Sequence, residues 1–286
     1  MNKEKIAIIV DSGTNVPDEY GTRYDIHVLP MVVIYKDRTY LDQIEITAEE
    51  VCKRFKEEIP STSLPSPQMA YDTFNKIKEE GYEKVITICV SSGLSNTYSM
   101  ICGVAGDMEG LEIEVIDTKN IGIAAGMSAI MAAELIEKGY SFKEVCDKVR
   151  KNVEKTKVFF CVDTLEYLKK GGRIGLVASL LGSALNLKPV ISCNDEGVYY
   201  TVSKARGRAK SLTTAINLAV ATAKDFAKYN IAVVHVAAKK EAEEVLERIK
   251  EQLPHHIHVL EGQISSALTV HTGPGLIGIG IQCVDW

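Results

Sequence analysis

The sequence predicts an α/β protein of two α/β domains, the first with a largely parallel sheet flanked by helices and the second with a mixed sheet and helices. Three observations support this class. Short apolar runs rich in β-branched residues, such as 6–10 and 84–90, alternate with longer stretches of helical period. Helix-capping motifs separate several of these stretches. After about residue 155 the alternation continues and includes a turn sequence typical of a hairpin.

The first half of the chain is expected to form βαβ units, because strand-like and helix-like segments alternate at the lengths that such units need. Capping boxes at 47–50 and 141–144 each open a helix. The Ser-Pro pair at 66–67 opens another, which Gly81 closes. These elements predict a first domain over residues 1–155.

The second half is expected to form a mixed sheet with helices over residues 156–286. In order, its predicted elements are strands at 158–162, 189–192 and 198–202, a helix at 209–228, a strand at 231–236, a helix at 240–252, and strands at 256–260 and 277–284. The second and third strands form a hairpin across a turn at 194–197. Two packed domains of this kind commonly enclose a ligand in the cleft between them.

Composition limits the classes of function. The 286 residues are 46% hydrophobic and 25% charged, which is ordinary for a globular protein. The formal net charge of −5 argues against nucleic acid as a partner, because no basic excess exists to neutralise phosphates. The seven cysteines form no C-x-x-C pair and show no metal-ligand spacing, so we interpret them as reduced core thiols and expect no metal.

Two apolar stretches, 121–133 and 174–187, are the most membrane-like segments. Both are shorter than the roughly 18–20 apolar residues that a spanning helix needs, so we interpret both as buried helices. Residues 1–5 are charged and lead straight into a strand-like run, so no signal peptide is expected. We therefore expect a cytoplasmic protein without an integral membrane segment, and transient membrane contact stays open.

Two hydroxyl-rich segments are the first candidates for a binding site. Residues 61–67 are Ser-Thr-Ser-Leu-Pro-Ser-Pro, and residues 90–98 are Val-Ser-Ser-Gly-Leu-Ser-Asn-Thr-Tyr. Each is expected to follow a strand of the same sheet and enter a helix, where hydroxyls and free N–H groups favour an anion. A third strand end, Asp-Ser-Gly-Thr at 11–14, is either a ligand contact or an ordinary turn and helix cap.

Nucleotide and hydrolase motifs are missing from these segments. Neither has the G-x-x-x-x-G-K-[ST] spacing of a P-loop, and no G-x-G-x-x-G follows a predicted strand. The run Ser92-Gly93-Leu94-Ser95 does not match G-x-S-x-G, so a nucleophile elbow is absent. A nucleotide site is therefore not favoured.

His271 is the one of six histidines that we favour for function. It begins the run His-Thr-Gly-Pro-Gly at 271–275, which is expected to be a stiff, partly exposed loop. His27 and His235 lie in predicted strands. A basic run at 204–210 places four cations in seven residues, and it is either a solvated face or a surface that docks on an acidic partner.

A series of short motifs runs in order over residues 11–275, nearly the whole chain. The motifs are Asp11-Ser12-Gly13, Thr62-Ser63 with Pro65-Ser66, Ser91-Ser92-Gly93-Leu94-Ser95 with Thr97-Tyr98, Val115-Ile116-Asp117, Leu165-Glu166-Tyr167-Leu168 with Gly171-Gly172-Arg173-Ile174, Lys188-Pro189, Arg206-Gly207 and His271-Thr272-Gly273-Pro274-Gly275. Each motif is weak alone, but the ordered series is specific. It resembles the DegV family of fatty-acid-binding proteins.

The resemblance implies that two α/β domains enclose a long-chain fatty acid, whose carboxylate is held by Thr62 and by one serine of the Ser-Ser-Gly-Leu-Ser motif. We assign that serine to Ser95 ahead of Ser92, and we place His271 close to the same head group. Their sequence neighbours are included as ligand-binding residues: Ser63, Asn96 and Thr272.

The resemblance also implies a protein partner. In family members with a known role, a separate fatty acid kinase phosphorylates the bound fatty acid to an acyl phosphate. Arg173 and Arg206 would lie near that partner, and no cofactor besides the bound fatty acid is expected. Leu64 stands where the family often has Gln, and Asn96 where it often has Gly, which puts chain length and head-group geometry in doubt.

Burial of a fatty acid is energetically reasonable. Each buried CH₂ contributes about 0.8 kcal/mol, so roughly sixteen carbons gain on the order of 10 kcal/mol. A buried carboxylate without donors costs several kcal/mol, so hydroxyls at the mouth are required. Gly122 and Gly126, four residues apart on a predicted helix, either leave room for the tail or serve close packing.

Three functions stay open from sequence alone. The first is a protein that binds and presents a fatty acid without catalysing a reaction. The second is an enzyme, either a serine hydrolase or a small-molecule kinase subunit, that uses Ser95 and His271. The third is a structural or regulatory module whose lipid is incidental.

Overall fold

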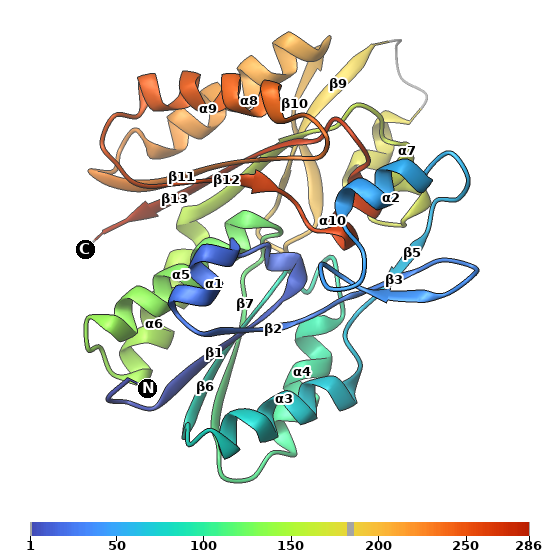
Figure 1. Cartoon of the computed structure of the whole chain (residues 1–286). Coiled ribbons are helices and arrows are strands. Elements are labelled where there is room, and N and C mark those ends of the chain that lie inside the picture. Colours follow the sequence, from blue (N-terminus) through green and yellow to red (C-terminus); the bar gives the residue numbers. More distant parts are fainter. Residues whose placement is uncertain (1, 182–185, 286) are drawn as a thin grey trace.

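The computed structural model describes residues 2–181 and 186–285, which fold into two large sheets and a small one (Figure 1). The first large sheet is parallel throughout, with the strand order β2-β1-β6-β7. Its strands are β1 (Ile6–Asp11), β2 (Ile26–Leu29), β6 (Lys84–Cys89) and β7 (Glu112–Asp117). The parallel α/β architecture predicted for the first half is therefore confirmed.

The second large sheet is mixed, with the strand order β10-β9-β8-β13-β11-β12. Its strands are β8 (Thr156–Cys161), β9 (Leu187–Cys193), β10 (Tyr199–Arg206), β11 (Lys228–His235), β12 (His256–Gln263) and β13 (Ile277–Val284). Only β11 and β12 pair in parallel among these neighbours. The predicted mixed sheet and the β9–β10 hairpin are confirmed. A domain boundary near residue 155 stays a prediction, and the two large sheets take their strands from either side of it.

The small sheet is antiparallel, with the strand order β4-β3-β5, and the sequence did not predict it. Its strands are β3 (Val32–Ile34), β4 (Thr39–Leu41) and β5 (Ser61–Ser63). Thr62 therefore lies in a strand opposite Val33 rather than in a loop. The expectation that both hydroxyl segments follow strands of one sheet was wrong. A Ser-Thr-Ser run has no apolar alternation, so only its pairing with β3 reveals the strand.

The helices of the described residues fall mostly where the sequence places them. They are α1 (Asp18–Arg23), α2 (Ala48–Arg54), α3 (Pro67–Glu79), α4 (Thr97–Gly106), α5 (Ile123–Glu137), α6 (Phe142–Asn152), α7 (Glu166–Lys170), α8 (Arg208–Ala223), α9 (Lys239–Gln252) and α10 (Ser266–Thr272), with 3₁₀ turns η1 (Ser12–Thr14), η2 (Val153–Lys155) and η3 (Gly175–Leu180). Both predicted capping boxes form, at the starts of α2 and α6. Ser66 caps α3 by accepting a hydrogen bond from the Met69 N–H, 3.1 Å long.

Helix α5 lies between the two large sheets (Figure 1). Ile123, Met127 and Ile130 pack in one cluster with the mixed sheet, whereas Ala129 and Ala132 pack in another with the parallel sheet. A helix that is covered on both sides needs apolar residues all round, which explains its composition. The prediction of a buried helix for 121–133 is confirmed.

The outer helices complete a layered arrangement. Helices α3 and α4 cover the face of the parallel sheet that points away from α5. Helices α8 and α9 cover the far face of the mixed sheet. Helix α6 packs beside α5 against the parallel sheet. The central strands β1, β6, β11 and β13 are thereby buried on both faces, as strands with continuous apolar runs require.

The second apolar stretch, 174–187, was wrongly predicted as a buried helix. Its described part forms η3 and then enters β9, and residues 182–185 of the prediction lie outside the described residues. Leu176 is 61% exposed. Gly175 has φ +52°, and a Cβ there would lie 2.7 Å from the Tyr199 carbonyl oxygen. This left-handed residue interrupts an α-helix at its start, which hydrophobicity alone does not reveal.

Three further features concern the described residues as a whole. No helix in 2–181 or 186–285 is long and apolar enough to cross a membrane. All seven cysteines are free thiols. Within the same ranges, no group of histidine, cysteine and acidic side chains is arranged to hold a metal ion.

Gly126 provides a test of the close packing around α5. A Cβ on Gly126 would lie 2.6 Å from the Thr14 carbonyl oxygen, so Gly126→Ala is expected to lower the free energy of unfolding by about 1–3 kcal/mol. Gly103, in α4, has nothing within 4 Å of the same position, so Gly103→Ala is expected to raise stability by roughly 0.5–1 kcal/mol. Urea denaturation of the three proteins measures both effects. Equal free energies of unfolding for the wild type and the two variants would contradict the close packing of α5 at Gly126.

Candidate functional site

A polar pocket lies where β5, the segment after β6 and α10 meet. It contains about 810 Å³ of empty space, part of it open to solvent. Six of the seven predicted ligand-binding residues line it: Thr62, Ser63, Ser95, Asn96, His271 and Thr272. The fold therefore brings together residues that lie more than 200 positions apart in the sequence.

His271 lies in the last turn of α10 rather than in the loop that the sequence predicted, and the residue is partly exposed, as expected. Its Nε2 is 2.7 Å from the Thr62 Oγ1. Gly171 presses against the other edge of the ring, because a Cβ there would lie 2.0 Å from the His271 Nδ1. Burial, assisted by the nearby Arg173 guanidinium, lowers the pKa of His271 to about 4, so the imidazole is neutral at pH 7.

The neutral imidazole has one proton, and its surroundings indicate where that proton lies. The Nδ1 atom is buried with no hydrogen-bond partner among the described residues. A buried N–H without an acceptor is rarer than an unpaired acceptor, so we assign the proton to Nε2. His271 then donates to the Thr62 hydroxyl oxygen, and the Thr62 proton stays available for a ligand in the pocket.

Ser95 presents a second hydroxyl in the same way. Its Oγ accepts a hydrogen bond from the Thr97 N–H at 3.3 Å and lies 2.8 Å from the Thr97 Oγ1. This interaction fixes the side chain at the start of α4 and satisfies one lone pair of its oxygen. Ser95 can therefore donate its proton to a ligand or to Thr97. Two oriented hydroxyl donors in this polar pocket, which we call the mouth, fit an acceptor such as a carboxylate.

Ser92 is the predicted ligand-binding residue that does not line the pocket. Its Oγ accepts from the Lys119 Nζ at 3.0 Å, and its N–H donates to the Asp117 Oδ1 at 3.2 Å. Lys119 also pairs with Asp117 at 2.8 Å, and this network lowers the pKa of Asp117 despite its burial. Ser92 thus belongs to the loop that supports Ser95. This position fits the preference for Ser95 over Ser92 as the head-group serine.

The two arginines expected at a partner surface lie in different environments. Arg173 lines the polar pocket, held by bonds from Nη1 to the Gly171 carbonyl (2.8 Å) and from Nε to the Leu94 carbonyl (3.3 Å). Arg206 ends β10 as an exposed side chain and does not line the pocket. Arg173 therefore adds a positive charge to the mouth, whereas Arg206 is open to a partner.

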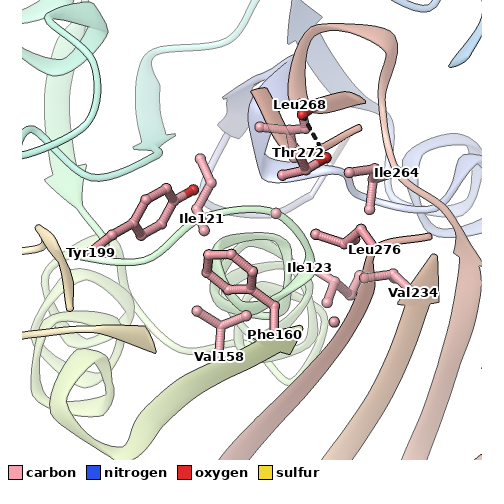
Figure 2. Close-up of a pocket in the computed structure, with 12 residues that line it drawn as sticks. Ile121, Ile123, Val158, Phe160, Tyr199, Val234, Ile264, Leu268, Thr272 and Leu276 are labelled. Atoms are coloured by element: carbon pink, nitrogen blue, oxygen red, sulfur yellow. Dashed lines mark hydrogen bonds between the residues drawn. The ribbon is translucent and has the colours of Figure 1, made fainter. Parts of the chain in front are cut away.

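An apolar hollow lies next to the polar mouth, and the two share Ile121, Tyr199, Leu268 and Thr272 as lining residues. Figure 2 shows the side chains that converge on it. The remaining lining residues are Gly122, Ile123, Val158, Phe160, Val234, Ile264, Leu276 and Gly278. Gly122 thus borders open space, whereas Gly126 serves close packing. Sequence reasoning left both uses open.

Tyr199 is one of three residues at this junction that sequence reasoning missed, with Ile121 and Leu268. It is buried in β10, its ring packs against Phe160 with centroids 5.0 Å apart, and its burial raises its pKa well above the ordinary value. The β9–β10 hairpin reaches the site because the Ser91 Oγ donates to the Gly197 carbonyl at 2.8 Å. No local sequence signal predicts this contact between segments about 100 residues apart.

Asp11 lies behind the wall of the mouth and not in it. Its Oδ2 accepts from the N–H of Val90, a lining residue, at 2.8 Å, and its Oδ1 is buried with no partner among the described residues. Burial raises the pKa of Asp11 to about 7, and the nearby Asp42 carboxylate contributes to the rise. The segment 11–14 therefore supports the site from the carboxyl end of β1. Ser12–Thr14 form the 3₁₀ turn η1, as the turn alternative expects, but the Asp11 side chain makes no capping hydrogen bond.

The arrangement does not favour serine hydrolysis. A catalytic triad needs a histidine bonded to the serine and oriented by a third group. Here the His271 Nε2 meets Thr62 rather than Ser95, and Nδ1 has no partner in the described parts of the chain. A histidine with a pKa of about 4 is also a weak general base at pH 7.

Fold and site together define the class of protein: a layered α/β protein with an apolar hollow next to a hydroxyl-lined mouth. The chain belongs to the DegV family, because a sequence model described as "Uncharacterised protein, DegV family" matches residues 5–283. A DegV domain-containing protein of Clostridium acetobutylicum is 38% identical over 276 residues, covering 96% of this chain and 98% of the relative. Protein DegV of Bacillus subtilis is 28% identical over 277 residues, covering 96% and 98%.

Solved structures extend the comparison to three dimensions. DegV of Bacillus subtilis, described as a fatty acid binding protein, matches with a TM-score of 0.89 at 26% identity, covering 99% of this chain and 100% of that one. A fatty-acid-binding DegV family protein of Thermus thermophilus matches at 0.90 and 27%, with the same coverage. A stearic acid-binding protein of Eubacterium ventriosum matches at 0.88 and 27%, covering 97% and 98%.

Proposed function

We propose that this protein binds one long-chain fatty acid, with the tail in the apolar hollow and the carboxylate at the polar mouth. The observation that carries the proposal is that the apolar hollow and the polar mouth lie side by side and share Ile121, Tyr199, Leu268 and Thr272 as lining residues. The relatives from Bacillus subtilis, Thermus thermophilus and Eubacterium ventriosum, described as fatty acid or stearic acid binders, support the same ligand class. No further cofactor enters this proposal.

The head group is recognised by three donors. Thr62, oriented by His271, and Ser95, oriented by Thr97, each offer a hydroxyl proton. Arg173 adds a fixed positive charge at the same mouth. Hydrogen bonds to a charged group contribute about 1.5–3 kcal/mol each, enough to offset the desolvation of a carboxylate. This assignment moves Arg173 from the partner surface, where we expected it, to the head group.

The protein acts as a carrier and not as an enzyme in this proposal. It presents the carboxylate to a separate fatty acid kinase, which forms an acyl phosphate, in the cytoplasm where its seven thiols stay reduced. The exposed Arg206 at the end of β10 belongs to the kinase-binding surface.

Ser95 and Ser92 form a matched pair for testing the head-group site. Ser95→Ala is expected to weaken palmitate binding about tenfold, because one hydrogen bond to the carboxylate is lost. Ser92→Ala is expected to leave the affinity unchanged, since Ser92 bonds to Lys119 and not to the pocket. Titration of delipidated protein with palmitate measures both. Equal affinities in the two variants would exclude Ser95 as a head-group ligand.

Arg206 tests the partner surface separately. With a fatty acid kinase and palmitate-loaded protein, Arg206→Ala is expected to slow acyl phosphate formation at least fivefold, because a charged contact to the partner is lost. Its affinity for palmitate should stay at the wild-type value. Arg248→Ala, which removes an exposed arginine on α9, is the control and should change neither quantity. A normal phosphorylation rate for Arg206→Ala would remove Arg206 from the kinase-binding surface.

A further inference from the structure

Asp42, between β4 and α2, is a buried carboxylate close to the site that no part of the proposed head-group contact uses. Its side chain is 1% exposed. Oδ2 accepts from the Ser12 hydroxyl at 2.5 Å. Oδ1 accepts from the Ser266 hydroxyl and, at 2.9 Å, from the Ala267 N–H. Three neutral donors thus satisfy a carboxylate in the interior, which is the condition for keeping such a group there.

These donors come from separate parts of the chain. Ser12 lies at the carboxyl end of β1, and its Oγ also accepts from the N–H of Met31, a lining residue of the mouth, at 2.9 Å. The Asp42 N–H donates to the Met31 carbonyl, also at 2.9 Å. Ser266 and Ala267 form the first turn of α10. Asp42 therefore connects the parallel sheet, the wall of the mouth and α10.

Helix α10 carries the head-group histidine at its other end. It has seven residues, and Ala267, Leu268, His271 and Thr272 all line the mouth. Such a short helix has little stability of its own, so its position depends on contacts at its two ends. Gly171 against His271 and Gly273 against Tyr167 fix the last turn. Asp42 fixes the first turn, together with the Ser265 cap on the Leu268 N–H.

We propose that Asp42 is a positioning residue that sets the register of α10 and thereby holds the His271 Nε2 against Thr62. The proposal rests on the proposed function, since it concerns how the same mouth is oriented for a carboxylate. A purely structural role would predict lost stability alone. A positioning role predicts in addition that the imidazole leaves its enclosed position and that Thr62 loses its donor.

The experiment compares two buried polar residues. Asp42→Ala removes all three acceptor contacts. Asn152→Ala is the matched control, because Asn152 is 2% exposed and bonds to the Cys283 carbonyl (2.7 Å) and Thr156 far from the mouth. Both variants are expected to lower the melting temperature. Only Asp42→Ala is expected to weaken palmitate binding, by about tenfold or more.

The second readout needs no ligand. In delipidated wild-type protein the His271 imidazole should titrate near pH 4 by NMR, since its pKa is about 4. In Asp42→Ala the midpoint should move up towards the ordinary histidine value of about 6.5, because the ring becomes solvated. Asn152→Ala should keep the wild-type midpoint.

A milder pair covers the case in which Asp42→Ala does not fold. Ser266→Ala removes one of the two bonds to Oδ1 and is expected to weaken palmitate binding roughly threefold and to raise the His271 midpoint. Ser211→Ala removes a buried hydroxyl in α8 that contacts the Cys161 Sγ at the end of β8, and it should change neither the affinity nor the midpoint. An unchanged affinity and an unchanged midpoint in folded Asp42→Ala or Ser266→Ala overturn the inference. Wild-type protein that binds no palmitate overturns the proposed function instead. In that case the midpoint of the His271 titration, measured without ligand, still tests whether Asp42 positions α10.

Discussion

The placement of α5 between two sheets is the constraint on which the rest of the structure depends. Burial on both sides leaves this helix no polar face, and Gly126 lets it approach the backbone of residues 14–16. Its first residues then border the apolar hollow through Gly122 and Ile123. The carboxyl end of β1 is connected to α10 through Asp42, and the segment after β6 lines the same mouth as α10. A hollow with a polar mouth follows from this arrangement of layers.

The chemistry of the mouth depends on the direction of a few protons. Burial keeps His271 neutral, and the unpartnered Nδ1 places its proton on Nε2, so that Thr62 can donate outward. A protonated His271 would add a second charge beside Arg173, which the enclosed ring disfavours. The site thus offers directed neutral donors with one guanidinium at its wall. That combination suits a carboxylate that must be bound and still reached by another protein.

Local signals predicted much of the fold, because caps, prolines and turn residues act over a few positions. Ser66 before Pro67 and the turn at 194–197 are examples. The family resemblance carried by the ordered motifs predicted six residues of the mouth, Thr62 and His271 among them. Sequence could not place His271 on a helix, Thr62 in a strand or Arg173 in the pocket, since each position follows from pairing across the fold. Sequence reasoning missed Asp42 and Tyr199, because the side-chain donors to Asp42 (Ser12 and Ser266) and the ring partner of Tyr199 (Phe160) are more than 20 residues away.

The most direct test of the account is the mass spectrum of what the protein carries. The mass of the purified protein is measured by native mass spectrometry, and the fatty acids in its solvent extract are identified by mass spectrometry after denaturation. The account predicts one long-chain fatty acid per chain in both measurements, or its stoichiometric uptake when delipidated protein is incubated with palmitate. Protein that carries no fatty acid and takes up none under these conditions would contradict the central claim.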